Sequence, residues 1–240
     1  MLFIEYTYNQ FCPNAKILDI GCGDGTIWLN NQNKISNNIS ITLADISLKM
    51  LEECQNNTQH LPQIKTIEEA DCYYLPYLDK SFDVVIANHV FMYFDDLPKA
   101  LQEINRILKD DGILYCSTIA KDMMKERDVM LKDFDSKISF DQEILYQLFG
   151  YENGKTKLEK YFQDIKLYDR KEVYEITDLD LYYQFILSGK GLSLNLEPLY
   201  KKKKQLYEYM QKYLNKNNLF YLTTHAGMFV AGKRKNEDNW

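Results

Sequence analysis

Short apolar runs alternate with stretches of helical periodicity through the first half of the chain. The runs have the length of buried strands, and the intervening residues repeat apolar positions three or four apart. The run Phe-Asp-Val-Val-Ile-Ala at 82–87 is the clearest strand, because a buried parallel strand is a nearly continuous β-branched run. The pattern predicts strands at 15–20, 39–44, 64–70, 82–87 and 113–118, and helices at 26–32, 48–57 and 97–108.

Local capping signals support these helices. Ser47 and Asp96 stand where an N-cap is expected, Pro98 lies in the first turn of the third helix, and Gly112 lies beyond its end. Five β-α units within about a hundred residues are typical of an open, mostly parallel sheet with helices on both faces. The fold class is therefore α/β.

The second half of the chain has a different pattern. It predicts helices at 121–134, 141–149, 177–188 and 198–215, an extended segment at 164–176, and strands at 219–224 and 227–233. Capping boxes are expected at Ser139 with Gln142 and at Thr177 with Asp180. The last two strands flank a predicted turn at His225-Ala226, which would expose His225. We interpret this half as a helical insertion after strand five, followed by the final strands of the same sheet.

A single domain over 1–240 fits this length. Within it, 1–120 is expected to be the cofactor-binding half, 121–217 a helical insertion on the acceptor side that includes strand six, and 218–233 the final strands. The longest apolar stretch, 84–94, is too short to span a membrane. The first residues lack the features of a secretion signal.

Charge and cysteine usage narrow the class of protein. The net charge is −6 at pH 7 and disfavours a nucleic-acid partner, which usually requires a basic face. Five cysteines without a C-x-x-C pair indicate reduced thiols rather than disulfides or a zinc site. We expect a cytoplasmic protein without a metal or a membrane partner, and the sequence does not indicate its oligomeric state.

The run Ile-Leu-Asp-Ile-Gly-Cys-Gly-Asp-Gly at 17–25 lies where strand one gives way to a helix. Glycines there let the backbone turn sharply and approach a ligand at the carboxyl end of a strand. Asp45 ends strand two, where a carboxylate can accept both hydroxyls of a ribose. Asp19 would repel a pyrophosphate but suits an α-amino group, and S-adenosylmethionine carries both an ammonium and a ribose. The alternative is a strand-turn-helix with solvated acids.

Four segments together resemble the class I S-adenosylmethionine-dependent methyltransferases, and most of all their small-molecule branch with the ubiquinone/menaquinone methyltransferases. They are I-L-D-I-G-C-G-D-G at 17–25, T-L-A-D-I-S-L-K-M-L at 42–51, A-D-C-Y-Y-L-P-Y-L-D-K-S-F-D-V-V-I-A-N-H-V at 70–90 and A-L-Q-E-I-N-R-I-L-K-D-D-G at 100–112. The resemblance covers about 15–118. It implies a Rossmann-like, seven-stranded sheet, with S-adenosylmethionine as the cofactor.

The resemblance also implies which residues bind the cofactor. The loop with Gly21, Cys22, Gly23 and Gly25 would hold its methionine portion, and Asp19 would orient its amino group. The ribose, the adenine and the methionyl group would be bound further along the chain: Asp45 on the ribose hydroxyls, Ile46 on the adenine face, Asp71 and the Cys72 N–H on the adenine edge, and the Asn88 carbonyl on the methionyl group.

Catalytic and acceptor residues are less clearly marked. His89 follows strand four and has a pKa suited to a general base, or it only shapes the pocket. Met92 and Tyr93 are candidates for the acceptor pocket, but about half of the aromatic run 91–94 is expected in the core. Because the cofactor's methyl is already activated, we expect His89 to assist without being essential.

Two departures from the family pattern stand out. The usual Pro-Gly-Gly before strand five is Asp110-Asp111-Gly112, and only sixteen residues precede Ile17, fewer than the helical lead of relatives. We therefore expect an open site, or one covered by 121–162, and a truncated gene start is the alternative.

The sequence predicts transfer of a methyl group to a small-molecule O, N or C acceptor by in-line displacement. A cofactor-binding regulator or degenerate enzyme without turnover is the first alternative. An RNA or protein methyltransferase is less favoured, because the Asn-Pro-Pro-Tyr type of motif is absent at 88–91. A nicotinamide oxidoreductase comes last, since the dehydrogenase glycine spacing is not met.

Overall fold

The computed structural model describes residues 12–140, 142–189 and 197–233, and its centre is one seven-stranded sheet in the order β3-β2-β1-β4-β5-β7-β6. β7 runs antiparallel to both β5 and β6, and the pairings among β1 to β5 are parallel. The strands are β1 (Lys16–Ile20), β2 (Ser40–Asp45), β3 (Ile64–Glu69), β4 (Phe82–Asn88), β5 (Leu108–Ile119), β6 (Phe162–Ile176) and β7 (Phe220–Lys233). The predicted fold class, a Rossmann-like seven-stranded sheet, is confirmed.

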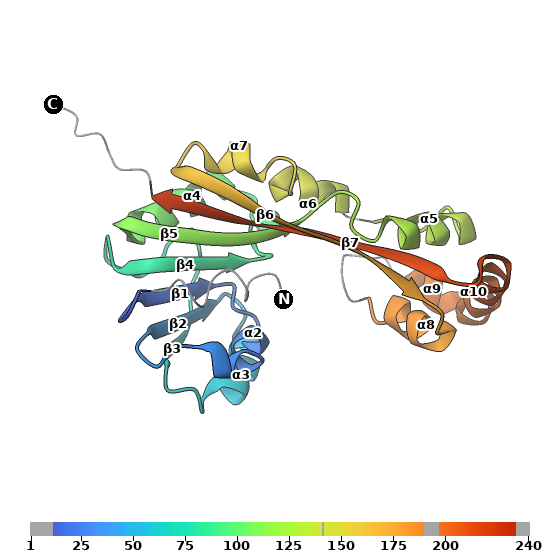
Figure 1. The fold of residues 1–240 in the computed structure, drawn as a ribbon, viewed down its shortest axis with the longest axis horizontal. Coiled ribbons are helices and arrows are strands. Elements are labelled where there is room, and N and C mark those ends of the chain that lie inside the picture. The colour runs from blue at the N-terminus through green and yellow to red at the C-terminus, as the bar shows by residue number, and fades with distance from the viewer. Residues whose placement is uncertain (1–11, 141, 190–196, 234–240) are drawn as a thin grey trace.

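Helices cover both faces of this sheet (Figure 1). One face packs Trp28, Leu51 and Cys54 against β1 and β2, and the other packs Leu101 and Ile104 against β4 and β5. The α-helices are α2 (Thr26–Leu29), α3 (Leu48–Thr58), α4 (Leu97–Ile107), α5 (Lys125–Phe134), α6 (Gln142–Phe149), α7 (Gly154–Leu158), α8 (Leu179–Leu187), α9 (Glu197–Lys201) and α10 (Lys203–Asn217). Two 3-10 turns are η1 (Gln32–Lys34) and η2 (Phe91–Tyr93).

The central strands form where the sequence supplies continuous apolar runs. Four of the five residues of β1 are buried, and β4 buries Phe82 and the four residues 84–87. The predicted caps are confirmed: Ser47 accepts from the Met50 N–H and Asp96 accepts from the Lys99 N–H. These caps satisfy backbone donors that a helix start leaves unpaired. Strand and helix ends thereby place the loops after β1, β2, β3 and β4 along one edge of the sheet.

β6 and β7 extend beyond the rest of the sheet as a long antiparallel pair of strands (Figure 1). Its far end carries α5, α8, α9 and α10, which we call the distal lobe together with 172–176 and 220–224. This lobe has its own apolar core, which includes Leu131, Tyr182, Met210 and Phe220. The predicted helical insertion after strand five is therefore divided: α5 to α7 precede β6, and α8 to α10 lie between β6 and β7.

The predicted turn at His225-Ala226 is wrong, because β7 is continuous from Phe220 to Lys233. The ladder to β6 includes the pair of His225 with Lys171, so no turn interrupts it. His225 is also not exposed: its ring bonds to Asp122 at 2.5 Å and to Asp169 at 2.8 Å, and 13% of the side chain is accessible. Long-range pairing overrides the weak turn signal, and the His225 ring joins Asp122, which follows β5, to Asp169 on β6.

Several predicted boundaries also change. β5 begins at Leu108, so 110–112 belongs to the strand rather than to a preceding turn. α2 ends at Leu29, α5 begins at Lys125, and the helix predicted at 198–215 is divided into α9 and α10. Asp178, not Thr177, caps α8 by accepting from the Leu181 N–H. The predicted capping box at Ser139 and Gln142 depends on 141, which lies outside the described residues.

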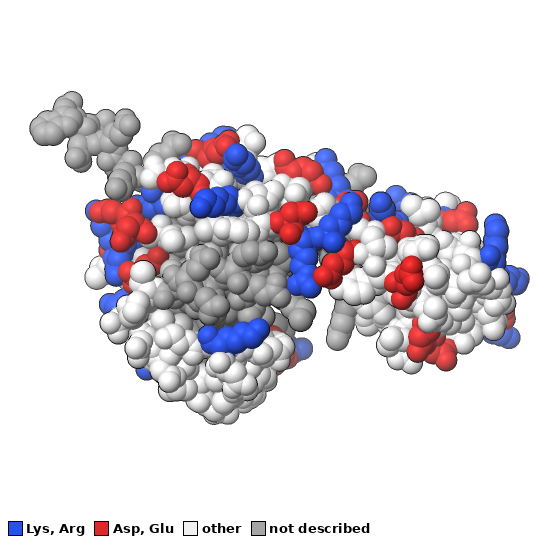
Figure 2. Space-filling model, viewed as in Figure 1, with Lys and Arg blue, Asp and Glu red and all other residues white. Residues whose placement is uncertain are grey.

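Acidic and basic side chains stand next to one another on the face shown in Figure 2, rather than in one large patch of either sign. Among the helices that the structure describes, none combines the length and apolar character that crossing a membrane requires.

Candidate active site

A cavity of about 480 Å³ opens where the parallel strands end at their carboxyl termini. Four loops reach it, those after β1, β2, β3 and β4. Its walls are formed by Ile20, Gly21, Asp45, Ile46, Ala70, Asp71, Cys72, Tyr73, Asn88, His89, Val90, Tyr93, Phe94 and Asp95. In open α/β sheets this edge is the usual place for a ligand. Eight of the predicted site residues, up to 72 positions apart in the sequence, thus line one cavity: Gly21, Asp45, Ile46, Asp71, Cys72, Asn88, His89 and the predicted acceptor residue Tyr93.

The glycine loop has a backbone that few other residues could adopt. Gly21, Gly23 and Gly25 have φ of +69°, +58° and +70°, in the left-handed region. A Cβ on Gly21 would lie 2.6 Å from a methyl of Val90, and one on Gly25 would lie 2.8 Å from the Cys54 Sγ. At Gly23 no atom lies within 4 Å of such a Cβ. Gly21 and Gly25 therefore let the loop pack closely against Val90 and Cys54, whereas the space beside Gly23 is open.

Asp45 is held in place by the backbone on both sides of it. Its Oδ2 accepts from the Gly23 N–H at 2.9 Å and its Oδ1 accepts from the Ser47 N–H at 2.9 Å. Each carboxylate oxygen has a second lone pair, so the group can accept further hydrogen bonds from the cavity. The contact also ties the glycine loop to the end of β2.

Asp19 lies in β1, two residues before Gly21, and does not line the cavity. It is 1% exposed, and its Oδ2 accepts from the Trp28 indole N–H at 2.7 Å. Its Oδ1 is buried and has no hydrogen-bond partner. Burial raises the pKa of the Asp19 carboxyl to about 7, the Trp28 bond opposes that rise, and the charge of Asp45 adds to it.

The adenine side of the predicted site is also assembled. Ile46 is 68% exposed and presents an apolar face at the cavity wall. Asp71 Oδ1 accepts from the Tyr73 N–H at 2.8 Å, which fixes the carboxylate at the end of β3. The Cys72 side chain is buried, and burial raises the pKa of its thiol well above the usual range. The thiol is therefore neutral, and Cys72 contributes a small apolar side chain.

Ser117, which our sequence analysis does not single out, connects two of the predicted residues. Its hydroxyl donates to Asn88 Oδ1 at 3.0 Å, and both its hydroxyl and its carbonyl oxygen accept from the His89 N–H at 3.2 Å. The Asn88 Nδ2 is buried without a partner. His89 has φ of +52°, a conformation in which a non-glycine residue is uncommon. Ser117 was not predictable because it reaches the site through the pairing of β5 with β4.

His89 is accessible from the cavity. Desolvation by the surrounding protein lowers the pKa of its imidazole to about 4. The imidazole is therefore neutral at pH 7.5 and can accept a proton.

The aromatic run 91–94 divides as predicted, with two residues in the core. Phe91 and Met92 are buried, Met92 beside Ile119 and Leu145, whereas Tyr93 and Phe94 line the cavity. The structure therefore places Tyr93, but not Met92, where an acceptor residue is expected. Cys22, Gly23 and Gly25 also do not line the cavity. The sequence did not mark the remaining wall residues, which are Ile20, Ala70, Tyr73, Val90 and Asp95, as site residues.

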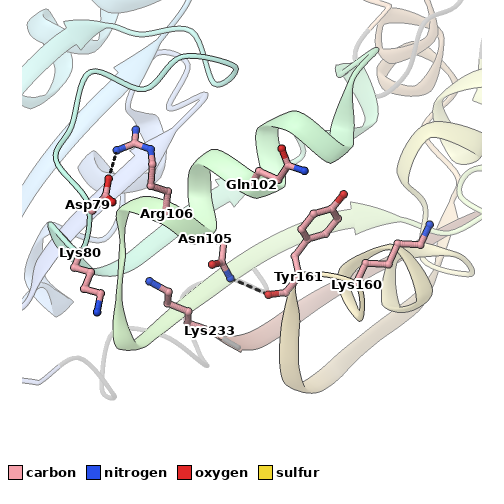
Figure 3. Close-up of a pocket in the computed structure, with 8 residues that line it drawn as sticks. All are labelled: Asp79, Lys80, Gln102, Asn105, Arg106, Lys160, Tyr161 and Lys233. Atoms are coloured by element: carbon pink, nitrogen blue, oxygen red, sulfur yellow. Dashed lines mark hydrogen bonds and ion pairs between the residues drawn. The ribbon is translucent and has the colours of Figure 1, made fainter. Parts of the chain in front are cut away.

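A second cavity, of about 400 Å³, lies at the opposite end of the sheet (Figure 3). Several of its charges are paired within the fold: Arg106 binds Asp79 at 2.8 Å and Lys80 binds Asp110 at 2.7 Å. Lys233 donates to the Leu108 carbonyl at 2.6 Å. These contacts fasten the loop before β4 and the end of β7 to the start of β5, so we assign this cavity a structural role.

Comparison with known proteins gives a family for this architecture. Residues 18–116 match the model of a methyltransferase domain. The chain is 30% identical over 229 residues to an uncharacterized protein of Methanocaldococcus jannaschii, across 92% of this chain and 76% of that relative. It is 35% identical over 132 residues to the ubiquinone/menaquinone biosynthesis C-methyltransferase UbiE of Rickettsia peacockii, across 53% of this chain and 52% of that enzyme. The match thus spans about half the length of the named enzyme.

Solved structures show the same fold. The YcgJ protein of Bacillus subtilis aligns with a TM-score of 0.61 at 17% identity, over 98% of this chain and 97% of that one. Phosphoethanolamine N-methyltransferase 2 of Haemonchus contortus, in complex with S-adenosyl-L-methionine, aligns with a TM-score of 0.57 at 18% identity, over 98% of this chain and 52% of that one. Residues 18–116 are therefore a methyltransferase domain of the class I type, in which S-adenosylmethionine is the methyl donor.

Proposed function

We propose that the protein transfers the methyl group of S-adenosylmethionine to an O, N or C atom of a small molecule by in-line displacement. One observation carries the proposal: a single cavity is lined by Gly21 of the glycine loop, by the acidic residues Asp45 and Asp71, and by Asn88 and His89 at the end of β4. Its volume lies within the roughly 300–1,000 Å³ typical of small-molecule sites.

The backbone conformation and the unpartnered polar atoms of the site fit the cofactor. Gly21 brings its left-handed backbone to the cavity wall, and the open space beside Gly23 leaves room next to the loop that a side chain would reduce. Two buried polar atoms at the site, Asp19 Oδ1 and Asn88 Nδ2, have no partner within the protein. Buried polar groups are nearly always hydrogen-bonded, so such orphans are typical of a site that a ligand completes.

We assign each part of the cofactor to groups of this chain. The loop of Gly21, Cys22, Gly23 and Gly25 holds the methionine portion through its backbone, and Asp19 orients the ammonium directly or through water. Asp45 accepts hydrogen bonds from the ribose hydroxyls. Ile46 packs on the adenine. Asp71 accepts a hydrogen bond from the exocyclic amine of the adenine, and the Cys72 N–H lies nearby. The Asn88 carbonyl faces the methionyl group.

The bound cofactor supplies an activated methyl group on a sulfonium. The chain's own residues then have mainly to align the acceptor, and alignment can account for roughly 7–11 kcal/mol of a barrier. The neutral imidazole of His89 can take a proton from a protonated acceptor such as a phenol or an ammonium. Its left-handed backbone, held by Ser117, keeps the ring at the mouth of the cavity.

The acceptor side of the cavity is aromatic. Tyr73, Tyr93 and Phe94 line it, and Tyr73 and Phe94 pack with ring centroids 5.7 Å apart. These walls support a small acceptor with apolar surface. A cytoplasmic location and the lack of a nucleic-acid partner stay predictions from the sequence.

Calorimetry with S-adenosylmethionine, S-adenosylhomocysteine and NAD tests the cofactor assignment. We expect saturable binding of the first two and none of NAD; heat with NAD alone would contradict the proposal. Turnover is then measured as S-adenosylhomocysteine formed against a panel of phenols, amines, carboxylates and activated carbon acids. Tight cofactor binding without turnover on the whole panel would favour the binding-only alternative.

A further inference from the structure

Trp28 makes a contact that the methyltransferase motif does not account for. This residue lies in α2, is fully buried, and donates its indole N–H to Asp19 Oδ2 at 2.7 Å. The contact joins the strand before the glycine loop to the helix after it. A hydrogen bond from a neutral donor to a buried carboxylate is short and strong because the acceptor is charged.

The same bond divides the two oxygens of Asp19 into different roles. Oδ2 is committed to Trp28, while Oδ1 is buried and has no partner. Burying a carboxylate costs free energy when only one of its two oxygens has a hydrogen-bond partner in the protein. Ile20 and Gly21, the two residues that follow Asp19 in the chain, line the cavity, so a cation bound at that part of the wall would act on the Asp19 carboxyl through its charge.

We propose that Trp28 is a positioning residue, which fixes the Asp19 carboxylate through its indole N–H and reserves Oδ1 for the cofactor's ammonium, so that cofactor binding expels a proton from Asp19. The inference rests on the proposed function, in which Asp19 faces that ammonium. The proton leaves the carboxylic acid for solvent, and the resulting carboxylate pairs with the ammonium, so the net charge of the site is conserved.

The groups around Asp19 support this coupling. Asp45 on β2 and the thiols of Cys22 and Cys54, on the loop and on α3, are the other titratable groups that act on it or respond to it. None of them is a cation, and burial holds the pKa of Asp19 near 7. In the free protein the group is therefore about half protonated at neutral pH. A nearby ammonium favours its charged form.

Titration calorimetry with S-adenosylhomocysteine at pH 6.0, 6.5, 7.0 and 7.5 tests the proposal, in pairs of buffers that differ in ionisation enthalpy. The range stays below about 7.7, the lower end of the pKa range of a free α-amino group, so the ligand's ammonium stays mostly protonated. For the wild type we expect affinity to rise nearly tenfold across this range, with close to one proton released per ligand at pH 6.0. Asp19→Asn should release none and should bind with an affinity that does not depend on pH.

Trp28→Phe keeps a ring in the core but removes the donor. We expect its affinity profile to move toward higher pH by about one unit, so that proton release persists at pH 7.5. Leu51→Ala is the matched control, since Leu51 lies in the same apolar cluster as Trp28. It should lower thermal stability without moving the profile. An unchanged profile in Trp28→Phe, or tight wild-type binding without proton release, would overturn the proposal.

A measurement on the unsubstituted, ligand-free protein covers the case in which Trp28→Phe fails to fold. The chain has two tryptophans, so the indole N–H resonance of Trp28 can be resolved by nitrogen-15 NMR. We expect this resonance to titrate with a midpoint near pH 7 in the wild type and not at all in Asp19→Asn. A resonance that ignores pH contradicts the pairing. Failure of S-adenosylhomocysteine to bind at any pH would instead reject the proposed function, and the NMR titration would still stand by itself.

Discussion

The cofactor half and the distal lobe are built from the same chain by different means. In the cofactor half, described over 12–120, the central strands β1 and β4 are nearly continuous buried runs, and both faces of the sheet bury apolar side chains against helices. In the distal lobe a two-stranded extension of the sheet carries helices on its far end, and the core is a mixture of Met, Tyr, Leu and Phe. The predicted cofactor residues all belong to the first region.

The difference shows which part of a protein a linear pattern can describe. Parallel strands need crossover helices, so the cofactor half repeats a unit whose periods alternate regularly. The distal lobe is held to the sheet by the antiparallel pair of β6 and β7, which has 13 paired positions. No local repeat in the sequence indicates this pairing. We therefore expect the two regions to respond separately to substitution.

The largest expected effect is on the distal lobe. Phe220 is buried there and stacks on Tyr213 at 5.3 Å, so Phe220→Ala should cost about 3–5 kcal/mol of folding free energy. Hydrogen exchange should show lost protection in α8 and α10 while β1 and β4 stay protected, and S-adenosylhomocysteine should bind within about twofold of wild type. Phe91→Ala, in the core beside the cavity, is the contrasting change and should weaken both stability and binding. Equal loss of protection in both regions after Phe220→Ala would show that they are one cooperative unit.

Next in size is the loss of the Asp45 carboxylate. Asp45→Asn keeps the shape but removes a charged acceptor, and we expect S-adenosylhomocysteine affinity to fall about 10–100-fold. Asp133→Asn is its matched partner in the distal lobe, where Asp133 accepts from the Tyr209 hydroxyl at 2.7 Å. Calorimetry should find that variant unchanged in affinity. If both variants bind like wild type, Asp45 does not hold the ribose.

A smaller effect concerns the pH dependence of folding. Because the folded-state pKa of Asp19 is raised to about 7 from 3.8, the native state binds more protons than the unfolded chain between these values. Its contribution to stability is therefore full below pH 3.8 and is lost as the pH rises toward 7. From pH 5 to pH 7 the ligand-free protein should lose about 2 kcal/mol through this group.

Urea unfolding at several pH values measures this loss. Asp19→Asn should flatten the difference by that amount, whereas Asp133→Asn should follow the wild-type curve. The assignment would be contradicted if the free energy of unfolding of the wild type rose from pH 5 to pH 7 and Asp19→Asn showed the same pH dependence as the wild type.

The smallest expected effect is on catalysis at His89. His89→Asn removes the base but tolerates the left-handed backbone, since asparagine adopts positive φ more readily than most residues. We expect unchanged cofactor affinity and a fall in kcat of about tenfold, at the low end of what a general base supplies. Complete loss of turnover with normal binding would make His89 essential rather than assisting.

Much of the cofactor half was predictable because its information is local. The strand at 82–87, the caps at Ser47 and Asp96, and the order of Asp19, Asp45 and Asp71 after successive strands follow from periodicity and from the rule that parallel strands end at one edge. The second half was less predictable, as His225 illustrates. Its neighbours suggested a turn, yet its partners Asp122 and Asp169 are more than fifty residues away.

The sequence by itself determined the α/β class, the glycine loop and the acidic strand ends, because each depends on residues a few positions apart or on the regular return of strands to one edge. Only the tertiary structure decided that β7 is unbroken, that Ser117 holds the Asn88-His89 corner, and that Trp28 engages Asp19. These contacts depend on strand register, on burial and on which atom of a side chain is left without a partner. Such properties exist only once the chain has excluded water from its interior, and no linear pattern records them.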